Sequence, residues 1–458
     1  MLISTSKNRE IEDLVNKLMK IVVLLIILGG VTAWFATRTP DTPFATLQAD
    51  NQKSDELIKR GEYVAHLSDC VACHTTPGNP AFSGGLAMGT PIGAVYTTNI
   101  TPDAETGIGN YSLADFDRAL RHGVAKDGHR LYPAMPYPSY SKMSDSDVQA
   151  LYAFFMNDVK PVHRPNQTPD IPWPLNMRWP LAFWSALFTE PGIYSTDSKQ
   201  DEQWNRGAYL VQGAGHCGSC HTPRGFAMQE KALDETSNDY LAGATLDGWY
   251  APSLRNDPNS GLGRWTEEDV YQFLKHGRNE HAVVYGSMTD AFNNSTQFMN
   301  DEDLYAIAHY LKSLPGNPER DGEPWQHEPQ IIAGNLLNKS GAQTYMTRCS
   351  SCHGNDGMGR GSAIPPLAGA TSMLVPDISS AVNITLNGSG RVVAQGVPDA
   401  YRMPPFRQQL SNEEIAEVLS FIRSSWGNHG GVVKSGDVEK MREETDPASS
   451  QVIILQMR

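Results

Sequence analysis

Three copies of one pentapeptide, C-x-x-C-H, constrain this chain more than any other feature of its sequence. They read Cys70-Val-Ala-Cys73-His74, Cys217-Gly-Ser-Cys220-His221 and Cys349-Ser-Ser-Cys352-His353. The pattern is typical of a covalent attachment site for haem c. Its two thiols join the porphyrin, and the adjacent histidine binds the iron. The sequence therefore predicts three covalently attached haems c, with His74, His221 and His353 as the proximal ligands.

The cysteine count argues against other uses of these thiols. All six cysteines of the 458-residue chain lie within the three motifs, so none remains for a disulfide, a free thiol or an iron–sulfur cluster. A zinc site needs two C-x-x-C pairs separated by about 12–20 residues. Cys73 and Cys217 are much farther apart in the chain than that, and each pair carries its own histidine.

Length and composition describe an exported globular protein rather than a nucleic-acid-binding one. At about 150 residues per domain, 458 residues correspond to roughly three domains. Hydrophobic residues make up 40% of the chain and charged residues 19%, as in ordinary folded proteins. The net charge of −14 argues against nucleic acid and against a polybasic membrane patch.

The N-terminus carries an uncharged apolar run at residues 21–36, preceded by Lys17 and Lys20. A membrane helix needs about 20 apolar residues, so the run is short for a full span. It is either a cleaved signal sequence or an uncleaved anchor. The long leading segment of mixed charge and the lack of an A-x-A site favour an anchor. The lysines then place residues 1–20 in the cytoplasm and the haem region on the periplasmic side of a bacterial inner membrane.

An internal repeat surrounds the three motifs. Arg60-Gly-Glu-Tyr63 precedes the first motif and Arg206-Gly-Ala-Tyr209 the second, while Gly341-Ala-Gln-Thr-Tyr345 is a looser third copy. We expect the glycine to let its helix pack closely against another helix, and the aromatic residue to pack near the haem edge.

Further helices follow each motif. Amphipathic segments with acidic first turns predict a last helix for each copy, at 144–155, 300–311 and 411–422. Middle helices that stop at glycine are predicted at 115–123 and 268–277.

The predicted fold class is all-α: three tandem cytochrome c-type haem domains with irregular loops, preceded by one N-terminal membrane helix. The haem domains are placed at 56–165, 201–316 and 335–428. The remaining segments are linkers at 37–55 and 317–334, an aromatic linker at 166–200 and a C-terminal tail at 429–458.

The sixth iron ligand decides between electron transfer and chemistry at an open iron. Between residues 335 and 428 the only histidine is His353, so that unit has no second histidine to offer. Met403 lies in a proline-stiffened loop before the last helix, and Met135 and Met288 hold the matching places in the other two units. Methionine is also common core filler, but this shared position favours methionine–histidine ligation, which raises the reduction potential.

Competing side chains remain for these ligand positions. Met143 and Met299 are the nearest methionines, and we expect the histidines outside the motifs to have packing or surface roles. Those histidines include His66, His122, His216 and His276.

Longer strings around the motifs carry a family resemblance. CVACHT, CGSCHTPRGFAMQ and CSSCHG, together with YPAMPYPSYSKM, WPLNMRWPL and LRNDPNSGLGRW, resemble the three-haem cytochrome c subunits of bacterial membrane-bound dehydrogenases. The likeness is greatest to the alcohol and gluconate dehydrogenase subunits of acetic acid bacteria, and it runs from about residue 56 to residue 427. It departs at both ends. Many relatives have a plainer cleaved signal and an extended amphipathic C-terminal segment, whereas the tail here is short and mostly polar.

The resemblance implies cofactors, ligands and partners. It implies haem attachment at the six motif cysteines, with Met135, Met288 and Met403 as distal ligands. A separate quinoprotein, flavoprotein or molybdenum subunit would oxidise the substrate, with or without a small third subunit, and this chain would pass the electrons to ubiquinone in the membrane.

The aromatic linker has no haem role and two interpretations. It holds Trp173, Trp179 and Trp184 close together in sequence. Such residues form either core between domains or an exposed contact for the dehydrogenase subunit or the membrane. The sequence leaves this open.

The function favoured by the sequence is a non-catalytic electron-transfer subunit, because no substrate base or nucleophile stands out. One alternative is a haem enzyme with one open catalytic iron, as in a peroxidase, for which the second unit is the place to look. Two further alternatives are a free-standing multihaem carrier to a terminal oxidase and a haem-based sensor.

Overall fold

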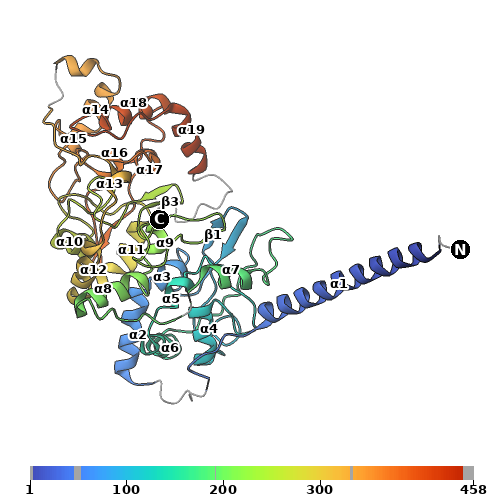
Figure 1. The fold of residues 1–458 in the computed structure, drawn as a ribbon. Helices are drawn as coiled ribbons and strands as arrows, with labels where there is room; N and C mark the ends of the chain where they lie inside the picture. The colour runs from blue at the N-terminus through green and yellow to red at the C-terminus, as the bar shows by residue number, and fades with distance from the viewer. Residues whose placement is uncertain (1–3, 46–52, 191, 331–333, 447–458) are drawn as a thin grey trace.

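A computed structural model describes residues 4–45, 53–190, 192–330 and 334–446 (Figure 1). One long helix, α1 (Ser4–Thr37), projects away from a body of short helices joined by irregular loops. Within α1, residues Asp13–Trp34 are long and apolar enough to cross a membrane, with a mean hydropathy of 2.2. The apolar helix expected at 21–36 is thus present, and the helical segment extends further toward the N-terminus.

Each haem motif lies on a short helical turn between a preceding helix and a later one. The motif turns are α3 (Cys70–Cys73), α9 (Gly218–His221) and α15 (Ser350–His353). The preceding helices are α2 (Asp55–Leu67), α8 (Glu202–Gln212) and α14 (Ala342–Arg348). The last helices are α6 (Asp145–Asn157), α12 (Asp301–Ser313) and α18 (Asn412–Ile422), which confirms the three predicted from the sequence.

The middle helices are α4 (Leu113–His122), α10 (Glu267–His276) and α17 (Ser379–Asn387). The first two confirm the predictions, and the third was not foreseen. All three are followed by a glycine with positive φ, at 62° for Gly123, 72° for Gly277 and 76° for Gly388. Glycine adopts this left-handed conformation at little cost, which is why it ends helices.

The remaining helices are short and mostly lie in the connections. They are α5 (Tyr137–Tyr140), α7 (Leu181–Phe188), α11 (Met288–Asn294), η2 (Thr296–Phe298), α13 (Pro318–Asp321), η3 (Gly334–Asn338), α16 (Thr371–Leu374) and α19 (Ser435–Glu444). The last of these, α19, lies in the predicted tail but contacts α17 and α18, with Val438 buried. The third unit therefore continues beyond residue 428.

The all-α expectation needs one correction, because the described residues also contain three antiparallel hairpins. They pair β1 (Ala87–Thr90) with β2 (Gly93–Tyr96), β3 (Ala244–Leu246) with β4 (Trp249–Ala251), and β5 (Val393–Ala394) with β6 (Val397–Pro398). Strands of two to four residues are too short to show an alternating sequence pattern.

A glycine makes the first and last helices of each unit cross at backbone contact. A Cβ atom on Gly61 would lie 1.9 Å from the carbonyl oxygen of Ala150, and one on Gly207 would lie 2.0 Å from that of Ala306. In the third unit, a Cβ on Gly341 would lie 2.2 Å from the carbonyl oxygen of Glu417. The close packing expected from the repeated glycine is confirmed in all three units.

The first two units share one hydrophobic core, and an exchange of hydrogen bonds joins them. The Tyr63 hydroxyl of the first unit donates to Asp303 Oδ2 of the second at 2.7 Å. Reciprocally, the Tyr209 hydroxyl of the second unit donates to Asp147 of the first. The same hydroxyls accept the N–H groups of Asn300 (3.2 Å) and Ser144 (3.1 Å), the residues that cap α12 and α6.

Each acceptor carboxylate in this exchange also binds an arginine of its own unit. Arg60 pairs with Asp147 at 2.8 Å, and Arg206 pairs with Asp303 at 2.7 Å. The tyrosines of the repeat thus connect units through their hydroxyl groups. The third unit has its own core, and its Tyr345 hydroxyl donates within the unit to the Gly354 carbonyl oxygen at 2.7 Å.

The helix crossing predicts a strong effect of one added methyl group. Gly207→Ala should destabilise the protein by about 2–3 kcal/mol through overpacking, lowering the midpoint of thermal unfolding by roughly 4–12 °C. Gly436→Ala is the control, because no atom lies within 4 Å of a Cβ there. Circular dichroism melting curves measure both, and equal midpoints for the two variants would contradict the crossing.

The exchanged hydrogen bonds predict a second stability effect. Tyr63→Phe and Tyr209→Phe should each lower the free energy of unfolding of the first two units by about 1–2 kcal/mol, because each removes a hydrogen bond to a charged acceptor. Tyr345→Phe should leave that transition unchanged. Urea titrations followed by circular dichroism measure the difference. An unchanged free energy of unfolding in Tyr63→Phe would contradict a stabilising role of the hydrogen bonds between the units.

Candidate haem centres

The histidine of each motif is oriented by one hydrogen bond from its ring. The Nδ1 atoms lie 2.7 Å from the Thr98 carbonyl oxygen for His74, 2.7 Å from that of Pro252 for His221, and 3.1 Å from that of Pro365 for His353. A carbonyl only accepts, so Nδ1 carries the proton and Nε2 keeps its lone pair. Metal-bound histidines typically have this arrangement. Burial lowers the pKa of all three imidazoles, which favours the neutral form that binds iron.

A glycine then fixes the main chain of each motif histidine. The N–H groups of Gly84, Gly243 and Gly359 donate to the carbonyl oxygens of His74 (2.7 Å), His221 (2.8 Å) and His353 (3.0 Å), respectively. All three glycines have positive φ. A Cβ on Gly359 would lie 2.2 Å from the Ile364 carbonyl oxygen, so a side chain does not fit there. Sequence reasoning missed these glycines, because each follows its motif at a different distance.

One cavity of about 1810 Å³ contacts motif residues of all three units. Ordinary ligand pockets measure about 300–1,000 Å³, so this space is large enough for more than one ligand. The motif cysteines and histidines that line it are Cys73, Cys217, Cys220, His221, Cys349, Cys352 and His353. The six motif cysteines, all in the described part of the chain, are not joined in disulfides. The size of the cavity, thiols that are not joined in disulfides and the oriented imidazoles fit covalently attached haem.

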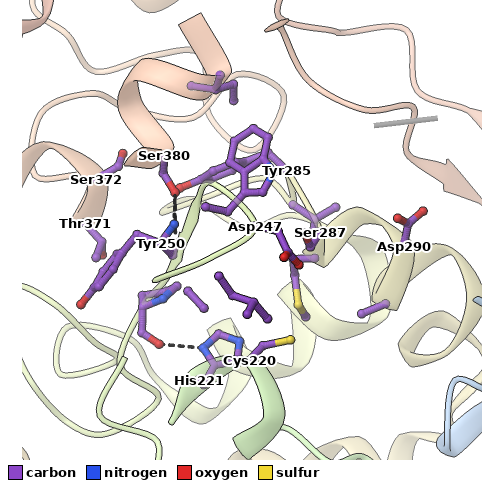
Figure 2. Close-up of a pocket in the computed structure, with 18 of the residues that line it drawn as sticks. Cys220, His221, Asp247, Tyr250, Tyr285, Ser287, Asp290, Thr371, Ser372 and Ser380 are labelled. Atoms are coloured by element: carbon purple, nitrogen blue, oxygen red, sulfur yellow. Dashed lines mark hydrogen bonds between the residues drawn. The ribbon is translucent and has the colours of Figure 1, made fainter. Parts of the chain in front are cut away.

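The second and third units meet at the wall of this cavity. Figure 2 shows Cys220 and His221 of α9 on one side and Ser372 and Ser380, from α16 and α17 of the third unit, on the other. The N–H of Tyr250 donates to Ser380 Oγ at 2.9 Å, and the Ser380 hydroxyl donates back to the Tyr250 carbonyl oxygen at 3.2 Å. The third unit therefore helps to enclose the cavity beside the second C-x-x-C-H motif.

Comparison with known proteins identifies the family of the chain. The cytochrome c family matches residues 205–315 and 339–426. The cytochrome c subunit of a quinone alcohol dehydrogenase from Gluconacetobacter polyoxogenes is 50% identical over 402 residues, which cover 86% of each chain. The chain belongs to the family of dehydrogenase cytochrome c subunits. The cytochrome c subunit of a gluconate 2-dehydrogenase from Pantoea cypripedii is 47% identical over 413 residues, covering 88% of this chain and 92% of the relative.

A third relative serves another dehydrogenase. The cytochrome subunit of a fructose dehydrogenase from Gluconobacter japonicus is 37% identical over 410 residues, covering 84% of this chain and 82% of the relative. The family resemblance seen in the sequence is thus confirmed. As a cytochrome c, the chain carries covalently attached haem c.

Two of the three expected methionine ligands line the same cavity as the motifs of this cytochrome. Met288 begins α11, and Met403 lies in the loop before α18. The Met403 main chain is held on both sides: its N–H donates to Ser389 Oγ at 3.0 Å, and its carbonyl oxygen accepts the Ser389 N–H at 3.1 Å. A side chain from this loop is therefore held in a defined place.

The first unit differs from the other two. Its Ala72 and Cys73 line the cavity, whereas Cys70, His74 and Met135 do not. Met135 is half-buried against the core shared by the first two units, although its neighbours Ala134 and Pro136 line the cavity. Met135 therefore stays a prediction from its position in the repeat.

The surroundings of the alternative ligand candidates distinguish them from one another. Met143 is fully buried in the core shared by the first two units and does not line the cavity. Met299 lines the cavity and remains the competitor of Met288. His66 has a packing role, because its Nδ1 lies 3.0 Å from the Asn294 carbonyl oxygen and its ring stacks on Phe298 at 4.3 Å.

The third centre provides a direct test of methionine ligation. Met403→Ala should lower the reduction potential of one haem and let the reduced protein bind one carbon monoxide per chain, because the thioether no longer fills the sixth position. Met358→Ala is the matched control, since Met358 lines the same cavity of the same unit. Redox titration and carbon monoxide difference spectra provide the measurements. An unchanged Met403→Ala spectrum would contradict the assignment.

Proposed function

We propose that this cytochrome relays electrons through three covalently attached haems c from a dehydrogenase catalytic subunit to ubiquinone. The haem domains lie on the periplasmic side of a bacterial inner membrane, and α1 is the anchor. The observation that carries the proposal is the cavity that contacts motif cysteines of all three units. Haems attached to these cysteines would lie next to one another within shared walls, as a relay requires.

The side chains of this protein would bind the haems and fill the ligand positions of their irons. Haem c supplies the one-electron chemistry, while the protein binds and orients it and excludes water. The Nδ1–H bonds of His74, His221 and His353 leave their Nε2 atoms as the ring atoms that would bind haem iron. Met135, Met288 and Met403 are the proposed distal ligands. A histidine together with a methionine at each haem would favour electron transfer over binding of a substrate.

The catalytic partner decides which substrate is oxidised. The relatives are named as subunits of alcohol, gluconate and fructose dehydrogenases, so similar cytochromes serve different enzymes. For this chain we propose a quinoprotein, flavoprotein or molybdenum dehydrogenase subunit as the electron donor, with or without a small third subunit.

An apolar opening of the cavity supports ubiquinone as the acceptor. Ile92, Leu175 and Phe226 line the cavity, and each is also exposed at the surface. At these positions an apolar quinone that leaves the bilayer would meet apolar side chains, although charged residues such as Arg224 and Asp247 also line the cavity.

The number of haems is predicted to be three per chain. The pyridine haemochrome assay, calibrated against protein concentration, should give three haems c for the native cytochrome and two for the double variant Cys349→Ala/Cys352→Ala. Ser350→Ala, within the same motif, should retain three. A native value of two would contradict the proposal, because one motif would then be unused.

Purification of the intact complex from membranes tests the relay. We expect a dehydrogenase subunit to co-purify, its substrate to reduce the haems, and a short-chain ubiquinone to reoxidise them. Rapid binding of carbon monoxide by the native reduced complex would instead favour an enzyme with an open iron. Reoxidation by a terminal oxidase and not by quinone would favour the free-standing carrier.

A further inference from the structure

Large apolar side chains are exposed around α7 and the loops beside it. Trp173 is 78% exposed, Leu187 75% and Phe226 96%. We call this surface the aromatic face. It also includes the exposed side chains of Ile92, Leu175, Met177, Trp179 and Met228. Patches of this kind on a protein surface generally mark a contact with a partner or a membrane.

Packed rings beneath the aromatic face join α7 to the 226–228 loop. Phe188 of α7 lies 6.4 Å from Phe226 and 5.5 Å from Trp184 between ring centroids. The Trp184 indole N–H donates to the Ala227 carbonyl oxygen at 2.9 Å, which holds the 226–228 loop against α7. Exposed side chains from separate parts of the chain therefore form one surface.

A short connection ties the aromatic face to α1. The apolar span of α1 ends at Trp34. The Arg38 carbonyl oxygen already accepts Arg130 Nη2 of the body at 3.0 Å, and the Pro40 carbonyl oxygen accepts Arg118 Nε at 3.2 Å. The chain thus joins the body within a few residues of the span. Helix α7 contacts α1 and lies beside the point where α1 leaves the body (Figure 1).

We propose that the aromatic face lies in the interfacial layer of the bilayer that α1 crosses. This inference rests on the proposed role of α1 as an anchor. With so short a connection, the surface beside the end of α1 must lie at the membrane. Tryptophan prefers that depth, because one part of its ring is apolar and its N–H is polar. Arg38, 54% exposed and stacked on Trp34 at 5.0 Å, sits where lipid phosphates would lie.

The placement sets the orientation of the haem body on the membrane. Leu175, Phe226 and Met228 belong to the aromatic face and also line the cavity. The opening of the cavity would then face lipid, and an apolar electron acceptor would enter it without crossing water.

Photolabelling from the lipid side tests the inference. The full-length holoprotein is reconstituted in vesicles of phosphatidylcholine and phosphatidylglycerol that include a phosphatidylcholine with a diazirine in its acyl chain. After illumination, mass spectrometry should find adducts on α1, on residues 173–188 and on residues 226–228. The segment around Val432 should stay unlabelled, although Val432 is 78% exposed.

A matched pair of variants sharpens the test. Leu187→Glu places a charge on the aromatic face and should lower its labelling severalfold, with an unchanged haem spectrum. Val432→Glu has a nearly equal starting exposure on the third unit and should change nothing.

The labelling pattern distinguishes failure of the proposed anchor from failure of the inference about the aromatic face. Missing adducts on α1 would overturn the anchor and with it the proposed membrane relay. Adducts on α1 without any on residues 173–188 would overturn the inference alone. Labelling of the aromatic face that disappears in the complex with the dehydrogenase subunit would also overturn it, because the face would then belong to that partner.

Discussion

Backbone contact between the first and last helix of each unit underlies the architecture of this cytochrome. Gly61 and Gly207 lie directly against carbonyl oxygens of α6 and α12, where even a methyl group has no room. Because no side chain separates the helices at these glycines, their backbones are in direct contact. Each motif turn follows its first helix closely, so the crossing also sets where the cysteines and the histidine emerge. The haem centres depend on this contact.

The units are then joined so that their centres keep fixed relative positions. Tyr63 and Tyr209 reach across to Asp303 and Asp147, and each carboxylate is held by an arginine of its own unit. The third unit instead docks through α17 onto the β3–β4 region. For electron transfer, rigid spacing matters more than strong binding at any one site. The motifs of the joined units line one cavity.

Much of the site was predictable, because its chemistry is local in sequence. The C-x-x-C-H motifs and the acidic starts of the last helices act within a few residues. The glycine before each motif was recognised from its repeated place in the sequence, although its packing partner lies on a distant helix. The carbonyl partners of the motif histidines were not predictable, since Thr98, Pro252 and Pro365 contribute only backbone oxygens. The hairpins were missed because their strands are too short for a pattern. Met135 shows the limit of positional matching, because it does not line the cavity that Met288 and Met403 share.

By itself, the sequence determined that the chain is a cytochrome with haem attachment motifs in a repeated helical unit and an apolar N-terminal segment. These properties follow from residue types at short spacing. Only the tertiary structure decided that residues of all three motifs line one cavity. It also decided that a tyrosine of each of the first two units donates a hydrogen bond to the other unit, and that the aromatic linker is exposed beside α1. Those properties depend on contacts between residues far apart in the chain, and the surfaces that meet there have no common sequence pattern.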